Sequence, residues 1–515
     1  MITEYFIDLE AKVNGSGSGS EQSPFNSAEV LNTLKYPYSA KIKRGGRQTV
    51  KIKLPTMSGQ NEQTTITAYG EGPNPVLIAS NAMAPVLDST LVKNLLISGI
   101  DFVCPFINYV SENLVYLRAN SEGVNHKANV IVEKSTIRYM HPVQIKTKAV
   151  YIDAIGGSGI KYRNDTLKVR DVNIYGGHWG VQIHCGSAYD LTGGKTEAYK
   201  GRDILIDNVA VIDAVGDGCQ VSFANGQGKP VIAHCYYRSE LYTYPNQLWT
   251  ASFWLGGCDD AGIEYCESAG SMLHLRDKMG FDIDGRCSGC WVRYCYSHNN
   301  GGGFGMFTDT CTDVFNNLAE MESVLIDQKA GNANNTMEYC LSYNDGVSRG
   351  GYAGNWLKFT VVRNVVSSRV SNCTFIDTLS KDPAHMIQWG QTQPYIFTKY
   401  PGVHMQNNIF YFKHAAVPVN DIGWGNGVGY MKWSNNILYS PEDNGASMID
   451  ARCSYENTLH ADPLVSFMGN NPPNGFEAAK LIGLLSRSVA HNAGSPNSLP
   501  DILGISGNNI GWLQS

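Results

Sequence analysis

Short apolar stretches in which every second residue is polar recur through the middle of the chain. They read GVQIHC from Gly180, GCQVSF from Gly218, GFDIDG from Gly280 and GFGMF from Gly303. A period of two predicts β-strands whose alternate side chains lie on opposite faces. The pattern predicts that the apolar side chains point into the core: Val181, Ile183, Cys219, Val221, Phe281, Ile283, Phe304 and Met306. It predicts that the polar ones point outward: Gln182, His184, Gln220, Ser222, Asp282 and Asp284.

A second strand-like stretch recurs with a cysteine at a constant place. It reads IEYCESAG around Cys266, VRYCYSHN around Cys295, MEYCLSYND around Cys340 and VSNCTFID around Cys373. Each copy is too short to bury its apolar face alone, so copies must stack coil on coil. A β-propeller would need a regular four-strand period, which is absent. The sequence therefore predicts an all-β fold, a right-handed single-stranded parallel β-helix.

The ends of the chain differ from the middle and divide it into three parts. Residues 1–86 are predicted to form an N-terminal cap and the first strands, and residues 87–440 the β-helix with loop insertions. Residues 441–515, rich in Pro, Asn and Gly toward the end, are predicted as a C-terminal closing segment. A solenoid needs both open ends covered, which gives these segments their expected role.

Composition narrows the function classes. The chain has 515 residues, of which 43% are hydrophobic and 17% charged, so a large core is available. The formal net charge of -6 argues against a nucleic-acid partner. No stretch is long and apolar enough to insert in a membrane, and no signal peptide is visible at Met1. Thirteen scattered cysteines predict mostly buried free thiols from a reducing compartment.

Several stretches resemble right-handed β-helix proteins of the pectate-lyase-like superfamily from bacteria and phages. The N-terminal EYFIDLEAKVNGSGSGSEQSPFNS and TTITAYGEGPNPVLIAS, the central coils, and the closing ADPLVS, GSPNS and IGW carry the resemblance. Members are mostly polysaccharide hydrolases, lyases or epimerases, and phage tailspikes that depolymerise surface glycans. The resemblance implies a polysaccharide partner, a virion (phage tail) or extracellular location, and a homotrimer if the chain is a tailspike. Related coils usually carry Asn where this chain has Cys266, Cys295 and Cys340.

Asp282 and Asp284 are the candidate catalytic pair. Residues i and i+2 of a strand share a face and lie about 6–7 Å apart. Glycoside hydrolysis uses two carboxyl groups, about 5–5.5 Å apart for retention and about 6.5–9.5 Å for inversion. We therefore expect this pair to act as acid and as base or nucleophile, with Asp217 in support. The alternative is a turn role, because Asp-Gly is a common turn pair.

Substrate-binding residues are predicted around this pair: Gln182, His184, Gln220, Arg276, Lys278, Trp254 and Trp179. Gln220 is expected to lie on the strand beside Asp282. The tryptophans offer faces on which sugar rings stack. Arg276 and Lys278 lie in a loop before the Asp282 strand and would neutralise a uronate or act as a base in a lyase.

The stretch after the acids has zinc-like spacing, with Cys287, Cys290, Cys295 and His298. Cys295 shares the register of the core cysteines, so no metal site is expected. The leading hypothesis is a depolymerase that hydrolyses a bacterial surface or extracellular glycan with carboxyl groups and without a cofactor. A polysaccharide lyase, with Ca²⁺ at the acids, and a non-catalytic glycan-binding β-helix are the alternatives.

Overall fold

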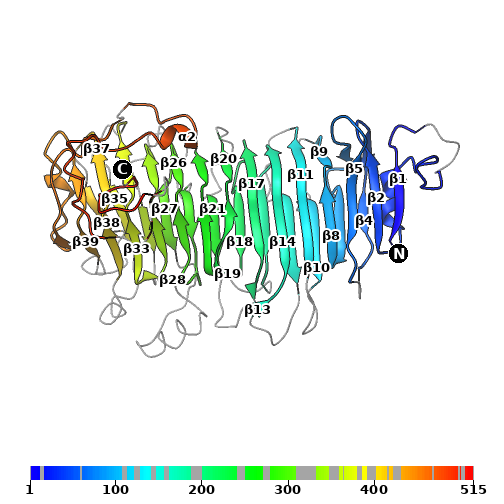
Figure 1. Ribbon diagram of the computed structural model, residues 1–515, viewed down its shortest axis with the longest axis horizontal. Coiled ribbons are helices and arrows are strands. Elements are labelled where there is room, and N and C mark those ends of the chain that lie inside the picture. Colours follow the sequence, from blue (N-terminus) through cyan, green and yellow to red (C-terminus); the bar gives the residue numbers. More distant parts are fainter. Residues whose placement is uncertain are drawn as a thin grey trace. The chain divides into compact units, whose positions relative to one another are not determined.

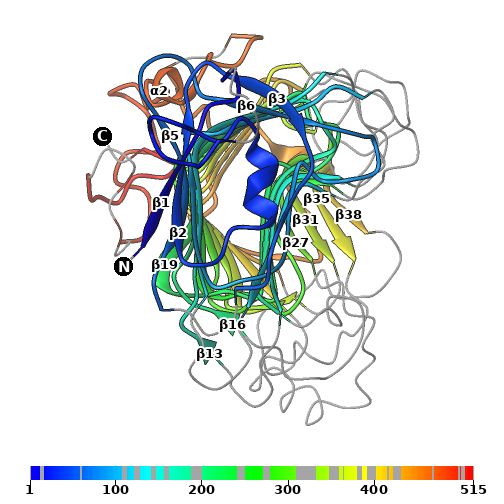
Figure 2. The ribbon, with the colours of Figure 1, turned by 90° about the vertical axis from the view of Figure 1, so that its right-hand side faces the viewer.

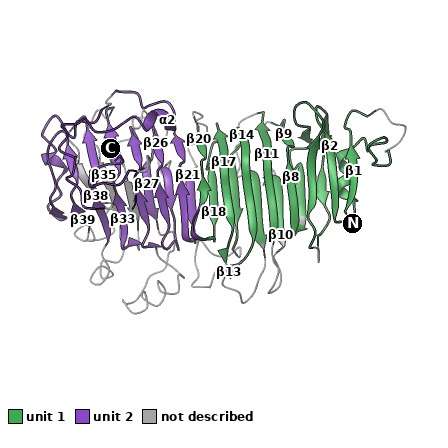
Figure 3. Cartoon of the chain, viewed as in Figure 1, with its two compact units in different colours: residues 1–188, 198–226, 231–244 green, residues 189–197, 227–230, 245–515 purple. Residues whose placement is uncertain are grey.

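The structure is a computed structural model in which the chain forms two compact units (Figures 1 and 3). Unit 1 comprises residues 1–188, 198–226 and 231–244, and unit 2 comprises residues 189–197, 227–230 and 245–515. The structure describes all residues except 1, 12–16, 58–60, 107–112, 121–127, 141–146, 156–161, 187–199, 240–249, 271–278, 309–331, 347–358, 363–364, 380–384, 391–401, 415–416, 422–430, 467–468, 497–498, 500, 502–504 and 514–515.

Unit 1 contains two series of stacked parallel strands. Sheet A1 consists of β1 (Thr3–Ile7), β2 (Tyr38–Lys43), β3 (Arg47–Val50), β5 (Thr64–Tyr69), β6 (Val76–Ala79), β8 (Asn94–Ser98), β9 (Asp101–Cys104), β11 (Asn129–Tyr139), β14 (Thr166–Tyr175), β17 (Ile204–Ile212), β19 (Asn225–Ala233) and β20 (Tyr236–Arg238). Sheet B1 consists of β4 (Ile52–Leu54), β7 (Leu87–Val92), β10 (Asn113–Asn120), β12 (Lys148–Ile155), β15 (Trp179–His184) and β18 (Cys219–Ser222). A short pair joins β13 (Tyr162–Arg163) to β16 (Lys200–Gly201).

Parallel pairing begins at the first strand of unit 1. Thr3 of β1 pairs with Tyr38 of β2, and Ser39 of β2 pairs with Thr65 of β5. Figure 2 shows these strands one behind another. The short 3-10 helix η1 (Ala28–Asn32), blue in that view, buries Ala28 and Leu31. The predicted first strands of residues 1–86 therefore stack in the same way as the coils that follow.

Unit 2 repeats the arrangement with shorter strands. Sheet A2 consists of β22 (Asp259–Glu264), β23 (Glu267–Ala269), β25 (Trp291–Arg293), β26 (Tyr296–His298), β29 (Thr336–Glu338), β30 (Leu341–Tyr343), β33 (Ser368–Ser371), β34 (Thr374–Asp377), β36 (Val403–Gln406), β37 (Ile409–Phe412), β39 (Lys432–Ser434), β40 (Ile437–Tyr439) and β41 (Ser454–Glu456). Sheet B2 consists of β21 (Ala251–Gly256), β24 (Met279–Ile283), β27 (Gly303–Thr308), β31 (Phe359–Val362), β35 (His385–Gly390) and β38 (Val417–Asp421). The pair β28 (Asn332–Ala333) and β32 (Val365–Val366), the 3-10 helix η4 (Ala446–Met448) and α2 (Phe476–Ala479) complete it.

The core lies between the sheets of each unit, as the alternation predicts. Val181 pairs with Cys219, and Ile183 with Val221, and all four side chains are buried. Parallel strands of one sheet are joined by right-handed crossovers in almost all proteins. The predicted all-β, right-handed parallel β-helix is confirmed, and with it the architecture that the family resemblance implied. Among the described residues, no helix is long and apolar enough to cross a membrane.

A ladder of thiols runs through the turns of unit 2 and continues as a ladder of amides. The Cys295, Cys340 and Cys373 thiols contact backbone oxygens one coil back, at 3.7, 3.7 and 3.6 Å from Ile263, Val292 and Met337. In the next two coils Asn408 and Asn436 donate to the oxygens of Val370 and Met405, at 2.9 and 2.8 Å. The cysteines therefore occupy the place of an amide ladder, as the resemblance implied.

Replacing Asn408 by Ala should destabilise unit 2. The Asn408 amide also accepts a hydrogen bond from the Cys373 N–H at 2.9 Å, so alanine leaves a buried donor and a buried acceptor unmatched. We expect a loss of about 2–3 kcal/mol in unfolding free energy. Asn408→Cys should lose clearly less, because a thiol at this place reaches the carbonyl, as in the preceding coils. Urea unfolding measures both, and equal midpoints for Ala and Cys would contradict the ladder.

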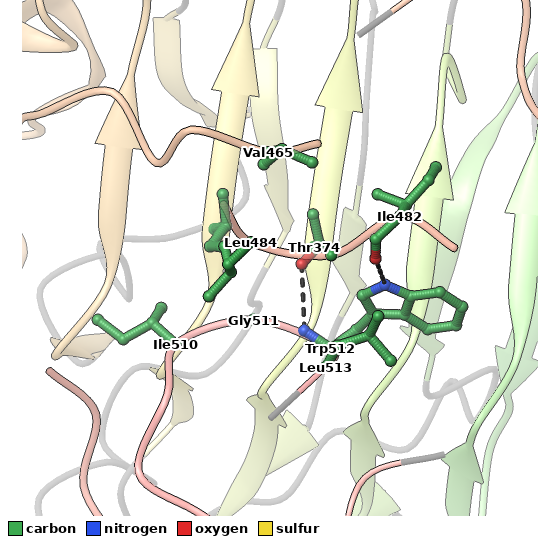
Figure 4. Close-up of a pocket in the computed structure, with 10 residues that line it drawn as sticks. Thr374, Val465, Ile482, Leu484, Ile510, Gly511, Trp512 and Leu513 are labelled. Carbon is green, nitrogen blue, oxygen red and sulfur yellow. Dashed lines mark hydrogen bonds between the residues drawn. The ribbon is translucent and has the colours of Figure 1, made fainter. Parts of the chain in front are cut away.

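The C-terminal segment covers one face of sheet A2. The hydroxyls of Tyr296, Tyr343 and Tyr339 donate to the backbone oxygens of Pro473, Gly469 and Leu499, respectively. Trp512 is buried, and its Nε1 donates to Ile482 O at 2.9 Å while its N–H donates to the Thr374 hydroxyl at 3.1 Å (Figure 4). The small pocket of Figure 4 lies under this segment and is lined mostly by apolar side chains.

Candidate functional site

Sheet B1 carries polar and aromatic side chains on the face that points away from the core. One row across four strands is Tyr116, Tyr151, Gln182 and Gln220, and the next is Arg118, Asp153, His184 and Ser222. Neighbours in such a row lie about 4.8 Å apart along the sheet. Together with Lys148 and Trp179, which pair with each other at the start of their strands, these residues form what we call the B1 face.

On the B1 face, cationic side chains lie against aromatic rings. The Tyr116 and Tyr151 rings stack with centroids 5.2 Å apart and planes 3° apart. The Arg118 guanidinium lies 4.8 Å from the Tyr116 ring centre, and the Lys148 ammonium lies 4.2 Å from that of Tyr151. The Lys148 ammonium is also 5.1 Å from the ring of Trp179. Cation–π contacts of this kind hold the half-buried side chains in fixed positions.

Asp153 sits in the middle of the B1 face. Burial raises the pKa of its carboxyl group above the usual range. Hydrogen bonds from Tyr151 and Tyr116 and the charges of Arg118 and Lys148 favour the ionised form, but they do not cancel the effect of burial. The Tyr116 hydroxyl donates to Asp153 Oδ2 at 3.5 Å, and the Arg118 Nε–H donates to that hydroxyl at 3.0 Å. Asp153 therefore holds its proton to a higher pH than an exposed aspartate.

Buried polar atoms on the B1 face lack partners within the described part of the chain. The Oε1 atoms of Gln182 and Gln220 and the Nε1 atom of Trp179 are buried and make no hydrogen bond with any described residue. Gln182 is 9% exposed and Gln220 is 3% exposed. A buried acceptor without a donor costs about 1–3 kcal/mol. A ligand that brings hydroxyl groups would satisfy these atoms.

The structure brings some of the predicted residues of unit 1 together. Gln182 pairs with Gln220 and His184 pairs with Ser222, as the alternation indicated. The His184 ring stacks on Phe223 at 5.4 Å. Asp217, predicted in support of catalysis, is buried, and its backbone oxygen accepts a hydrogen bond from Gly180 N–H at 2.9 Å. Burial raises the pKa of Tyr237 on β20, and the nearby Asp217 carboxyl adds to that rise.

The neighbours of Asp282 in sheet B2 differ from those expected. Asp282 pairs with Trp254 on one side and with Met306 on the other, so the prediction that Gln220 lies on the adjacent strand is wrong. The reason is that Ala251–Gly256, which the sequence pattern did not identify as a strand, form β21 and pair with β24. Met306, predicted to point inward, shares the row of Asp282 and packs with Met279, Ala251 and Trp254. Asp282 is only 5% exposed.

Asp284 lies just after β24 and is more accessible than Asp282. Its backbone N–H donates to Leu255 O at 2.8 Å, and its Oδ1 accepts a hydrogen bond from Gly285 N–H at 2.6 Å. The Asp-Gly turn contact is therefore present, and the Asp284 side chain is half-buried. Arg276 and Lys278 lie outside the described residues.

The residues with zinc-like spacing occupy different environments. The Cys290 thiol contacts Cys258 O at 3.3 Å, and the Cys295 thiol belongs to the ladder. His298 lies 3.2 Å from the Glu267 carboxylate and stacks on Tyr296. Burial raises the pKa of the Cys287 and Cys295 thiols, which disfavours the thiolate that a metal needs. Within the described part of the chain, no three His, Cys, Asp or Glu side chains gather in a metal-binding group.

Sequence reasoning missed half of the B1 face. Tyr116, Arg118, Lys148, Tyr151 and Asp153 were not among the predicted site residues. The signal was present, because NLVYLRAN from Asn113 and KAVYIDAI from Lys148 alternate in the same way as GVQIHC. Each places two polar side chains at i and i+2, in register with Gln182 and His184.

Among known proteins, the chain is similar to solved structures but not to a family model or a curated sequence. The GH136 lacto-N-biosidase from Eubacterium ramulus is 17% identical, with 79% of this chain and 67% of that chain covered and a TM-score of 0.44. Pectate lyase Pel9A is 12% identical over 99% and 96% of the two chains, with a TM-score of 0.39. XylC in complex with xylose is 9% identical over 90% and 87%, with a TM-score of 0.33. The fold assignment rests on the strand pairings themselves.

Proposed function

We propose that this chain is an enzyme that cleaves a polysaccharide by carboxyl acid/base hydrolysis. We assign sugar binding to the outward face of sheet B1 and, separately, the reacting carboxyl groups to sheet B2. The observation that carries the proposal is the row of stacked Tyr116 and Tyr151 rings beside the unmatched Gln182 and Gln220 oxygens. Sugar rings pair an apolar face with a rim of hydroxyl groups. Aromatic faces suit the former and buried acceptors the latter.

Asp282 and Asp284 are the carboxyl groups that we propose for the chemistry. In such a reaction one carboxyl group protonates the glycosidic oxygen as the bond to the anomeric carbon breaks. The other takes a proton from the attacking water, or attacks the anomeric carbon itself. Trp254, paired with Asp282 and half-exposed, offers a ring for the sugar next to the reacting bond. From the family resemblance we further propose that the chain is a phage tailspike and forms a homotrimer.

Digestion of a panel of bacterial surface and extracellular glycans tests the function. Wild-type protein is expected to shorten at least one glycan to oligosaccharides that do not absorb in the ultraviolet. Products with an unsaturated sugar, which absorb there, would show a lyase instead. Cleavage of no glycan would favour the non-catalytic binding module.

The double variant Gln182→Ala, Gln220→Ala tests the binding row. We expect KM for a cleaved glycan to rise at least tenfold with a smaller change in kcat, because two hydrogen bonds of about 1 kcal/mol each are lost. Gln22→Ala, at an exposed position far along the sequence, is the matched control and should leave KM unchanged. An unchanged KM in the double variant would remove the B1 face from the binding site.

A further inference from the structure

Arg118 is the feature of the B1 face that the proposed function leaves unexplained. It is half-buried, its Nε–H donates to the Tyr116 hydroxyl, and it forms no ion pair with a described residue. Arginine presents five N–H groups in a planar fork that matches a carboxylate or sulfate group. On this face, the guanidinium lies over the Tyr116 ring, and the Asp88 and Asp153 carboxyl groups near it favour its charged form.

A second cation lies on the same face. The Lys148 ammonium lies over both the Tyr151 and Trp179 rings, so its charge is held on the outer side of the sheet. The stacked Tyr116 and Tyr151 rings separate the two cations. An acidic sugar bound along this row would therefore meet a positive charge beside each of the two tyrosines.

We propose that the B1 face is a subsite for an acidic sugar, whose carboxylate or sulfate group is bound by Arg118 and Lys148. The subsite deepens the proposed function and rests on it, because it names the chemical class of the glycan. The neighbouring Gln182 and Gln220 oxygens accept hydrogen bonds from the hydroxyl groups of the same or the next sugar.

Asp153 gives this subsite a dependence on pH. When protonated, its carboxyl group can donate a hydrogen bond to an anion, and when ionised it repels one. Burial raises the pKa of Asp153, so the protonated form persists above the usual range for an aspartate. The charged and titratable groups that face it are Arg118 and Tyr116 on β10, Lys148 and Tyr151 on β12, His184 on β15, and Asp88 on β7.

The sign of the effect follows from this geometry. Affinity for an acidic sugar should fall as pH rises through the raised pKa of Asp153, because the subsite then gains a negative charge. Asp153→Asn removes this charge change, so the variant isolates the contribution of Asp153 to the pH dependence.

Calorimetric titration with three oligosaccharides of one backbone tests the subsite. The probes are a uronic-acid hexasaccharide, its carboxyl-reduced neutral counterpart, and a sulfated derivative of the neutral one. Wild type is expected to bind at least one acidic probe at least tenfold more tightly than the neutral probe. The stronger of the two acidic probes identifies the anionic group.

Arg118→Gln should abolish most of that preference while leaving affinity for the neutral probe within about threefold. The matched control is Arg170→Gln on sheet A1, where the guanidinium pairs with Glu133 at 2.6 Å, and it should bind as wild type. Asp153→Asn should bind the acidic probe at least as well as wild type at neutral pH, and its affinity should fall less than that of wild type as the pH rises.

Two results would overturn the subsite. One is equal affinity of wild type for acidic and neutral probes, and the other is an unchanged acidic preference in Arg118→Gln. After either result, the proposed function still holds if the wild-type protein cleaves a neutral glycan. Failure of wild type to bind any probe or cleave any glycan would overturn the proposed function and the subsite together.

Discussion

Asp282→Asn is expected to lower kcat for glycan cleavage by about 100- to 10,000-fold, the range usual for losing a positioned proton-transfer group. Asparagine keeps the shape of the side chain but can neither give up nor take a proton at the reacting atoms. Because Asp282 is 5% exposed and packed between Trp254 and Met306, a substitution of equal size should leave the packing intact. Reducing-end assays on a cleaved glycan measure kcat, and circular dichroism checks the fold.

Asp284→Asn should also lower kcat strongly if the two carboxyl groups share the chemistry. Its turn contact survives, since the asparagine oxygen can still accept from Gly285 N–H. Asp203→Asn in unit 1, where the carboxylate is 56% exposed and paired with Lys168, is the control for loss of an acid. Cleavage at the wild-type rate by both Asp282→Asn and Asp284→Asn would exclude the pair as the catalytic groups.

Trp512→Ala is expected to lower the unfolding free energy of unit 2 by about 3–5 kcal/mol, the cost usual for truncating a buried aromatic side chain. The indole is 2% exposed and packs in one cluster with Tyr296, Leu341 and Ile482. Its loss also leaves the Ile482 oxygen without the Nε1 donor. Thermal or urea unfolding measures the change, and limited proteolysis should show earlier cleavage after residue 460.

Leu481→Ala is the matched control in the same segment. Leu481 is 80% exposed, so its truncation removes little packing and should shift stability by less than about 0.5 kcal/mol. If Trp512→Ala proved as stable as Leu481→Ala, the C-terminal segment would not contribute to the stability of sheet A2.

Alternation of residues was sufficient to predict the coils and the register of β15 and β18. It worked because a parallel stack places like positions side by side, so Gln182 and Gln220 follow from the same pattern. It failed at β27, where Phe304 faces the core near Phe375 and the next residue is Gly305. A Cβ added to Gly305 would lie 3.0 Å from the Met337 sulfur, so this position faces the core too. Two successive inward positions shift Met306 to the outer face.

The candidate site was harder to predict than the fold. A pattern shows which face a side chain takes but not how deeply it is buried, so the burial of Asp282 beside Trp254 and Met306 could not be predicted. Strand β21 was missed because its sequence, ASFWLG, does not alternate regularly between apolar and polar residues. The B1 face could not be predicted from a pair of carboxylates, because it carries the single aspartate Asp153, whose raised pKa comes from burial and not from spacing.

The thiol ladder has a consequence for when the chain can fold. Adjacent coils place their cysteines about 4.8 Å apart, within the range over which disulfides form. The thiols of Cys266, Cys295, Cys340 and Cys373 are nevertheless free and buried. Oxidation before the coils close would join neighbouring turns with bonds that the packed core does not contain. We therefore expect that oxidation during folding lowers the yield of folded unit 2, whereas the buried thiols of the folded unit react slowly.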